Sequence, residues 1–244
     1  MGLDIYAGPL CRYYAGQWQT VVQQWGAANG IPVTVVRPDG GGLRRLWRNL
    51  TSIFAANAQE IDPVDGVVDW RNHLGASRLL PSETDWNWPE SLHGPFDTDK
   101  PDFDGYGAVL LWAAYATRPE MTRPRQWNGD WEADPAFAEV SQSQSDFNHI
   151  VGPELWLPVD FDAVFEAEEP NGNQTKIGSV SRLWEQMNRL NDRSWKAPVE
   201  TVRKWREEGY NPEEFESLAR WGFSIWYCLT EFAVKQRVPM RLDY

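Results

Sequence analysis

The residues best able to do chemistry are tryptophans and acids that lie close together between positions 83 and 106. Trp86 and Trp88 stand on either side of Asn87, and the same stretch continues with one histidine and four further acids: His93, Asp97, Asp99, Asp102 and Asp104. Tryptophan offers a large contact area at low entropic cost, and carboxylates steer a basic partner over long distances. The stretch therefore predicts a recognition surface for a basic protein. The alternative is that Trp86 and Trp88 hold a long loop against the core.

A second group of acids, Asp160, Asp162 and Glu166, forms an alternative acidic site. The spacing of Asp160 and Asp162 puts both side chains on one face of a strand. Converging carboxylates can bind a cation, or serve as acid and base on a sugar-like substrate. The alternative is a solvated strand face, because exposed acids are the norm.

Other catalytic and metal-binding patterns are missing from the sequence. It contains no Gly-x-Ser-x-Gly elbow, and His73, His93 and His149 have no cysteine or second histidine at metal-ligand spacing. Pro101 interrupts the acids at 97 to 104, so they do not form an EF-hand calcium loop. The glycines at 40 to 42 precede a basic segment but lack the Lys-Ser/Thr pair of a phosphate loop, so we expect a turn there. The sequence predicts no metal and no cofactor.

The charge of the chain narrows the class of partner. Asp and Glu number 35 against 23 Lys and Arg, which gives a net charge of −12. Nucleic-acid binders present basic surfaces, so we expect no nucleic-acid partner, whereas a cationic partner is allowed. Solubility alone also explains such a charge.

The N-terminal sequence and the cysteines indicate the compartment. Two cysteines, Cys11 and Cys228, are too few for a disulfide framework, and the first residues do not resemble a secretory signal. No apolar run approaches the roughly 18 residues of a membrane span. We therefore expect a cytoplasmic protein with reduced thiols and no membrane contact.

The element that must organise these residues is a long helix near the end of the chain. Apolar residues recur at three- and four-residue steps from Phe215 to Phe232, and others cover the remaining sides. This pattern predicts a buried helix over 212–236, with Asn211 as its cap and Pro212 at its first position. Residues 238–242 then read as a strand.

The rest of the chain predicts a small mixed sheet. A strand at 3–7, a helix at 15–29 and a strand at 32–37 indicate an opening β-α-β unit. Further on we expect a helix at 106–117, a strand at 154–159, a hairpin turn at 171–173, a helix capped by Ser179 or Ser181, and a helix at 198–208. Residues 60–105 show little periodicity. The fold class is therefore α+β, as a single domain whose terminal strands both join the sheet against the long C-terminal helix.

Both chain ends carry an acid in a predicted strand. If these strands share one sheet, Asp4 and Asp243 face the same side as Tyr6. The segments 1–6, 155–161 and 239–244 together resemble a family of bacterial proteins of unknown function. This resemblance implies no activity and no functional residue.

Two functions fit these observations. We expect an acidic protein-binding domain of the immunity or inhibitor type, and the alternative is a carboxylate-based hydrolase acting on a sugar-like substrate. A deep pocket with converging carboxylates would favour the hydrolase, and a broad exposed aromatic patch surrounded by acids would favour the binding protein.

Overall fold

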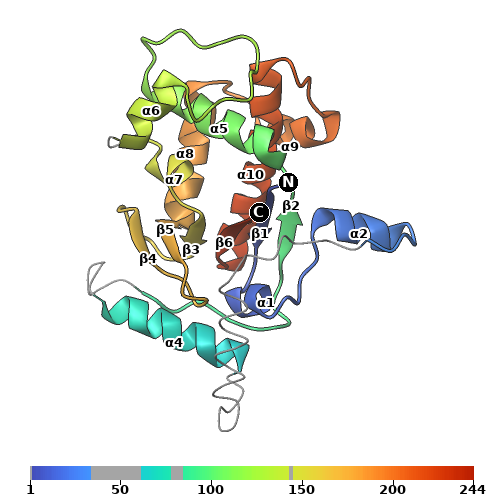
Figure 1. Ribbon diagram of the computed structural model, residues 1–244, viewed down its shortest axis with the longest axis vertical. Helices are drawn as coiled ribbons and strands as arrows, with labels where there is room; N and C mark the ends of the chain where they lie inside the picture. Colours follow the sequence, from blue (N-terminus) through green and yellow to red (C-terminus); the bar gives the residue numbers. More distant parts are fainter. Residues whose placement is uncertain (1, 34–61, 78–84, 143–144) are drawn as a thin grey trace.

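The computed structural model describes residues 2–33, 62–77, 85–142 and 145–244 (Figure 1). Within these ranges, six strands form one mixed sheet in the order β2-β1-β6-β3-β5-β4. The strands are β1 (Asp4–Ala7), β2 (Asp97–Asp99), β3 (Leu155–Leu157), β4 (Phe165–Glu168), β5 (Gln174–Ser179) and β6 (Met240–Asp243). Only β3 and β5 run parallel; the other neighbouring strands are antiparallel. The predicted mixed sheet with both terminal strands is confirmed.

Helices cover this sheet and surround its ends. Those described are α1 (Leu10–Tyr14), α2 (Val21–Ala28), α4 (Pro63–Ala76), α5 (Asp102–Thr117), α6 (Pro135–Gln142), α7 (Asn148–Val151), α8 (Val180–Arg193), α9 (Val199–Glu208) and α10 (Phe215–Gln236). In the described part of the chain, none of these helices has both the length and the apolar character needed to cross a membrane.

The larger core lies between α10 and one face of the sheet. Ile5 and Met240 point from β1 and β6 toward this core, where Trp226 of α10 is fully buried. Helices α5, α8 and α9 pack around α10, which confirms the predicted central helix. A Cβ on Gly222 of α10 would lie 2.3 Å from the carbonyl oxygen of Gly105 in α5, so the two helices cross too closely for any side chain there.

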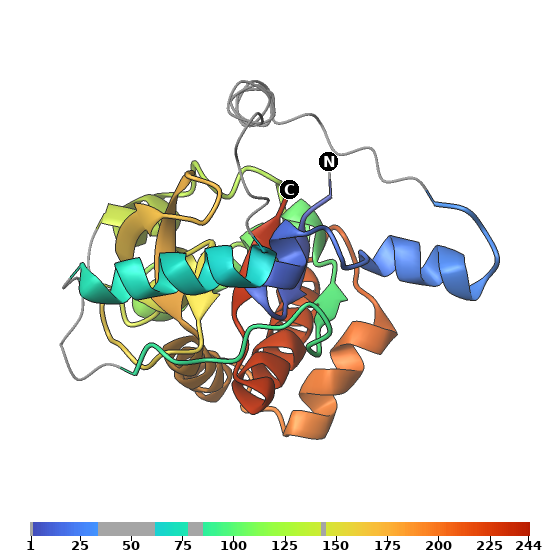
Figure 2. The ribbon, with the colours of Figure 1, turned by 90° about the horizontal axis from the view of Figure 1, so that it is seen from below.

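The opposite face of the sheet carries a second, smaller core. Leu155 and Ile177 point from β3 and β5 to this side and pack with Leu10 of α1 and Val67 of α4. Helices α1 and α4 meet each other on this side (Figure 2). Both faces of the sheet are therefore covered. On the second face, α1 can bury polar side chains of the central strands.

Several predicted boundaries were wrong. Helix α10 begins at Phe215 with Glu214 at its cap, because the Asn211 side chain accepts a hydrogen bond from the Glu213 N–H in a turn ahead of the helix. Residues 63–76 form the full helix α4, where the sequence indicated only a short strand or a turn of helix at 67–70; the Asp62 side chain caps α4 at the Val64 N–H. The predicted strand at 32–37 lies outside the described residues except for positions 32 and 33. The glycines at 40–42 lie wholly outside them.

The stretch from 83 to 106 also differs from the single loop that was predicted. Residues 97–99 form the edge strand β2, and α5 begins at Asp102, four residues before the predicted start. By contrast, the turn between β4 and β5 and the Ser179 cap of α8 are confirmed, since β4 and β5 pair as a hairpin and the Ser179 side chain accepts from the Arg182 N–H.

Candidate functional site

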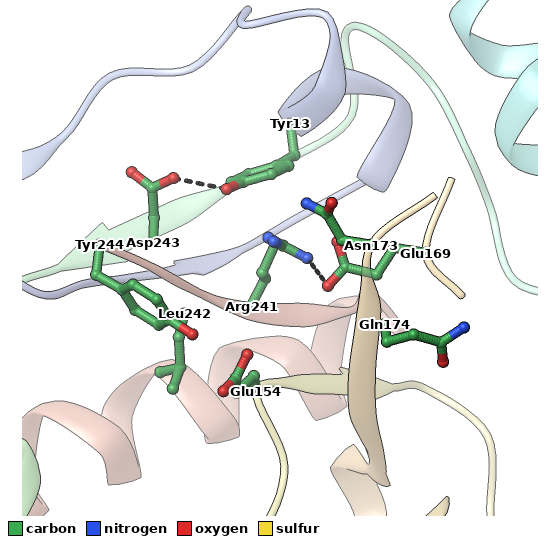
Figure 3. Close-up of a pocket in the computed structure, with 9 residues that line it drawn as sticks. All are labelled: Tyr13, Glu154, Glu169, Asn173, Gln174, Arg241, Leu242, Asp243 and Tyr244. Carbon is green, nitrogen blue, oxygen red and sulfur yellow. Dashed lines mark hydrogen bonds and ion pairs between the residues drawn. The ribbon is translucent and has the colours of Figure 1, made fainter. Parts of the chain in front are cut away.

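A polar pocket opens beside the central strands of the sheet, at the place where the two ends of the chain meet (Figure 3). Its volume is about 430 Å³. The lining comes from α1, from the segment before β3, from the β4–β5 hairpin and from β6: Tyr13, Glu154, Glu169, Asn173, Gln174, Arg241, Leu242, Asp243 and Tyr244. We call this site the sheet pocket. Its volume falls in the range of small-ligand pockets.

The alternation of β6 places its polar residues in this pocket. Met240 and Leu242 point into the α10 core, so Arg241 and Asp243 point to the other face. Strand β1 pairs with β6 so that Asp4 stands opposite Asp243 and Tyr6 stands opposite Arg241. The predicted placement of Asp4, Asp243 and Tyr6 on one side of the sheet is therefore confirmed.

An enclosed ion pair, Arg241 with Glu169, forms one wall of the sheet pocket. Their side chains are only 15% and 2% exposed, so the two charges depend on each other. The Tyr14 hydroxyl donates to Glu169 Oε2 over 3.1 Å. The guanidinium carbon of Arg241 lies 4.9 Å from the ring centre of Tyr13 and 5.8 Å from that of Tyr14. A carboxylate and two tyrosine rings thus hold a guanidinium in place.

The hairpin turn between β4 and β5 fixes Glu169. Its N–H donates to the Asn173 carbonyl at 2.8 Å, and its own carbonyl accepts from the Gly172 N–H at 2.8 Å. Gly172 has a φ of +83°, a conformation that glycine adopts without steric cost. The turn chemistry that was read from the sequence therefore positions a carboxylate of the pocket.

Tyrosines accompany the other two carboxylates. The Tyr13 hydroxyl donates to Asp243 Oδ1 over 2.6 Å. Burial and the Glu154 carboxylate together raise the pKa of Tyr244, which lines the pocket beside that acid. Burial raises the pKa of Tyr13 to about 12, so this phenol stays neutral and acts as a donor near neutral pH. For Arg241, burial acts to lower the pKa, but Tyr13, Tyr14 and Glu169 outweigh it and raise the pKa above its usual value. The arginine therefore remains charged.

Asp4 is buried in β1, on the strand next to this pocket. Its Oδ1 atom has no hydrogen-bond partner in the described part of the chain. Burial raises its pKa to about 6, Lys100 acts in the opposite direction, and the neighbouring Asp243 raises it further. Negative charge is thus concentrated where β1 and β6 pair.

The arrangement favours cations and donors of hydrogen bonds. Three carboxylates, on Glu154, Glu169 and Asp243, line the sheet pocket against one guanidinium. Within the described residues, no group of three or more histidine, cysteine or acidic side chains is arranged to hold a metal ion.

The predicted tryptophans turn out to sit at different depths. Trp88 is 2% exposed, and its Nε1–H donates to Glu90 Oε1 over 2.8 Å. Glu90 in turn accepts from the Leu10 and Cys11 N–H groups at the start of α1. Trp86 is half-buried and lies against Gly75 of α4. Trp88 therefore attaches this segment to α1 and offers no surface to a partner.

The other predicted residues of this stretch point to separate places. His93 is exposed, and Asp97 lies on β2. Asp99 is buried, with Oδ2 2.8 Å from Arg206 Nε. Asp102 pairs with Lys100 at 3.4 Å, and Asp104 accepts from Trp127 Nε1 at 3.1 Å. The structure does not bring the seven residues into one site.

The alternative acidic group is partly assembled. Asp160 and Asp162 lie on either side of Arg182, whose Nε is 3.1 Å from one carboxylate and 2.9 Å from the other. They are 67% and 87% exposed, so these ion pairs lie in solvent. Glu166 is exposed on β4, opposite Lys176 of β5.

Most residues of the sheet pocket were missed from the sequence. Of its lining, only Asp243 was singled out, through its alternation in the last strand. Tyr13 lies more than a hundred positions before Glu169 and Arg241 in the sequence, so no local spacing connects the three residues. The predicted turn at 171–173 also contributes to the site, since it contains the lining residue Asn173.

Comparisons with known proteins add no identification, since no protein-family model, no curated protein and no solved structure matches the chain.

Proposed function

We propose that this chain is a binding protein for a basic partner, and that the sheet pocket receives a cationic side chain of that partner. The observation that carries this proposal is the composition of the pocket wall, with three carboxylates against one arginine. The net charge of −12 adds a long-range attraction for a basic protein.

The surroundings of Arg241 indicate which kinds of side chain bind a guanidinium group in this pocket. It lies against tyrosine rings and ion-pairs with Glu169. The same kinds of group, a carboxylate and a tyrosine, are repeated across the pocket by Glu154 and Tyr244, next to Asp243. An incoming guanidinium or ammonium group can therefore exchange its water for carboxylate oxygens and a ring face.

A hydrolase acting on a sugar-like substrate is the second candidate, and the convergence of carboxylates and tyrosines in one cavity favours it. Its weakness is Glu169, which is committed to Arg241 and Tyr14 and is 2% exposed. Only Glu154 and Asp243 remain for acid and base roles. Turnover of nitrophenyl glycosides that is lost in Glu154→Gln would establish the hydrolase.

Agmatine tests the binding proposal, because it carries a guanidinium and an ammonium group on a short apolar chain. Isothermal titration calorimetry should show weak binding to the intact protein, in the millimolar range typical of small fragments with few contacts. Glu154→Gln removes one carboxylate of the pocket and should weaken binding by about five- to tenfold.

A matched control is Glu207→Gln, which removes an exposed acid on α9. It should lower the affinity by less than about twofold, since exposed charges far from the site are screened by salt. Equal effects of the two variants, or no binding of agmatine at low salt, would contradict the proposal.

A further inference from the structure

The C-terminal ends of α5 and α8 lie near each other (Figure 1). Residues from these ends and from the segments that follow them line a second pocket. Its volume is about 520 Å³, and it belongs to a different part of the molecule from the sheet pocket. One wall is apolar and includes Ala116, Pro119 and Met121. We call it the Arg123 pocket, after the residue that lies on its rim.

The charges of the Arg123 pocket are opposite to those of the chain as a whole. Arg123, Arg193 and Lys196 line it against a single acid, Asp192. Arg193 is paired outside the pocket, with its Nη1 2.7 Å from Asp146. Among the described residues, neither Arg123 nor Lys196 forms an ion pair, although acids outnumber bases by 35 to 23 in this protein. Two cations are therefore left open beside one cavity.

Arg123 is held in position by an aromatic stack. Its guanidinium carbon lies 3.6 Å from the ring centre of Trp112. Trp112 is itself fixed, because it stacks on Trp195 at 5.0 Å and its Nε1–H donates to Ser194 Oγ over 2.9 Å. A guanidinium stacked on a fixed ring keeps its donors available for an anion and loses little freedom on binding.

Lys196 occupies a backbone conformation that usually favours glycine. Its φ is +51°. Asn191 imposes this conformation, since its carbonyl accepts from the Lys196 N–H at 2.8 Å and its side chain forms two hydrogen bonds with Ala197. A bulky residue in this region of the Ramachandran plot is strained, so this conformation of Lys196 lowers the stability of the fold.

We propose that the Arg123 pocket binds a small organic anion, with its carboxylate or phosphate group between Arg123 and Lys196 and its apolar body against Met121. This site is independent of the proposed function of the sheet pocket. The competing explanation for Lys196 is purely structural, namely that it neutralises the carbonyl end of α8.

Two pairs of probes test the proposal and distinguish the anionic groups. Benzoate is compared with neutral benzamide, and phenyl phosphate with neutral benzyl alcohol, by following methyl resonances of the four methionines in the intact protein. Met121→Leu assigns the relevant signal. At least one anion should shift the Met121 methyl group and bind about tenfold or more tightly than its neutral counterpart, which corresponds to about 1.4 kcal/mol. If neither anion binds better than its neutral counterpart, the proposal is wrong.

Two variants then separate binding from folding. Lys196→Gly removes the charge and relieves the backbone strain, so it should raise the melting temperature while weakening anion binding by about fivefold or more. Arg123→Gln should weaken binding to a similar extent, and Lys204→Gln, an exposed charge on α9, should leave it unchanged. A lower melting temperature with unchanged binding in Lys196→Gly would show that Lys196 only stabilises α8, and would overturn the proposal.

Discussion

Asp4 and Asp243 stand directly opposite each other on β1 and β6, so the first and last strands of the fold bring two carboxylates together beside the sheet pocket. Like charges in register destabilise a strand pair, and burial adds to this cost for Asp4. A fold that keeps such a pair concentrates negative charge at this point. The pairing therefore connects the stability of the sheet with the proposed preference of the pocket for cations.

Asp4→Asn should stabilise the protein at neutral pH. The pKa of Asp4 rises from an ordinary value of 3.8 to about 6 in the folded state, mainly through burial. The folded state therefore holds the proton more tightly, and this stabilisation is present below about pH 3.8 and is lost as the pH rises through about 6. We expect the variant to gain about 1–3 kcal/mol in the free energy of unfolding above pH 6.

Urea denaturation across the pH range measures this effect, with Asp130→Asn at an exposed position as the control. The gain should shrink as the pH falls below about 6 and disappear well below pH 3.8, where Asp4 is neutral in both the folded and the unfolded state. A gain that is constant with pH, or absent near neutrality, would show that the pKa of Asp4 is not raised in the folded state.

Removing Arg241 should be costly because it leaves Glu169 charged, buried and unpaired. Arg241→Met should lower the free energy of unfolding by about 3–5 kcal/mol. Replacing both partners, as in Arg241→Met with Glu169→Leu, should recover most of the loss. If the double variant is as unstable as the single one, the ion pair is not the reason for the loss.

The central position of α10 predicts the effect of Trp226→Ala. This side chain is fully buried and lies 5.4 Å from the ring of Trp156 in β3. Emptying such a site should cost about 3–5 kcal/mol in denaturant unfolding. A loss below about 1 kcal/mol, the range of surface substitutions, would place the helix outside the core.

Deletion of residues 238–244 should prevent folding of the whole described sheet. Strand β6 lies between β1 and β3, so its removal leaves two half-sheets with unpaired edges. Far-ultraviolet circular dichroism and thermal melting should show loss of the cooperative transition. An unchanged melting temperature would mean that β6 is only an appendage.

The sequence predicted the fold better than the site, for physical reasons that particular residues illustrate. The stripe from Phe215 to Phe232 and the alternation of Met240 and Leu242 are local patterns, so both elements were found. The extent of α4 was missed because its apolar pattern is weak and Gly66 and Gly75 interrupt it. The signal for its start was the cap residue Asp62, which was not recognised.

The sheet pocket depended on contacts that no local pattern contains. Arg241 lies beside Glu169 and Tyr14 because β6 pairs with β1 and β3, which are both far from it in the sequence. The acids at 97–104 show the reverse effect. They are close in sequence, but β2 and α5 direct Asp99 toward Arg206 and Asp104 toward Trp127.

The central claim, that the sheet pocket receives a cationic group, is tested most directly by a crystal structure of the protein with agmatine. We expect the guanidinium or the ammonium group of agmatine between Glu154 and Asp243, against the ring of Tyr244, with the Arg241–Glu169 pair unchanged. Agmatine bound elsewhere, or a sheet pocket without agmatine at saturating concentration, would contradict the account.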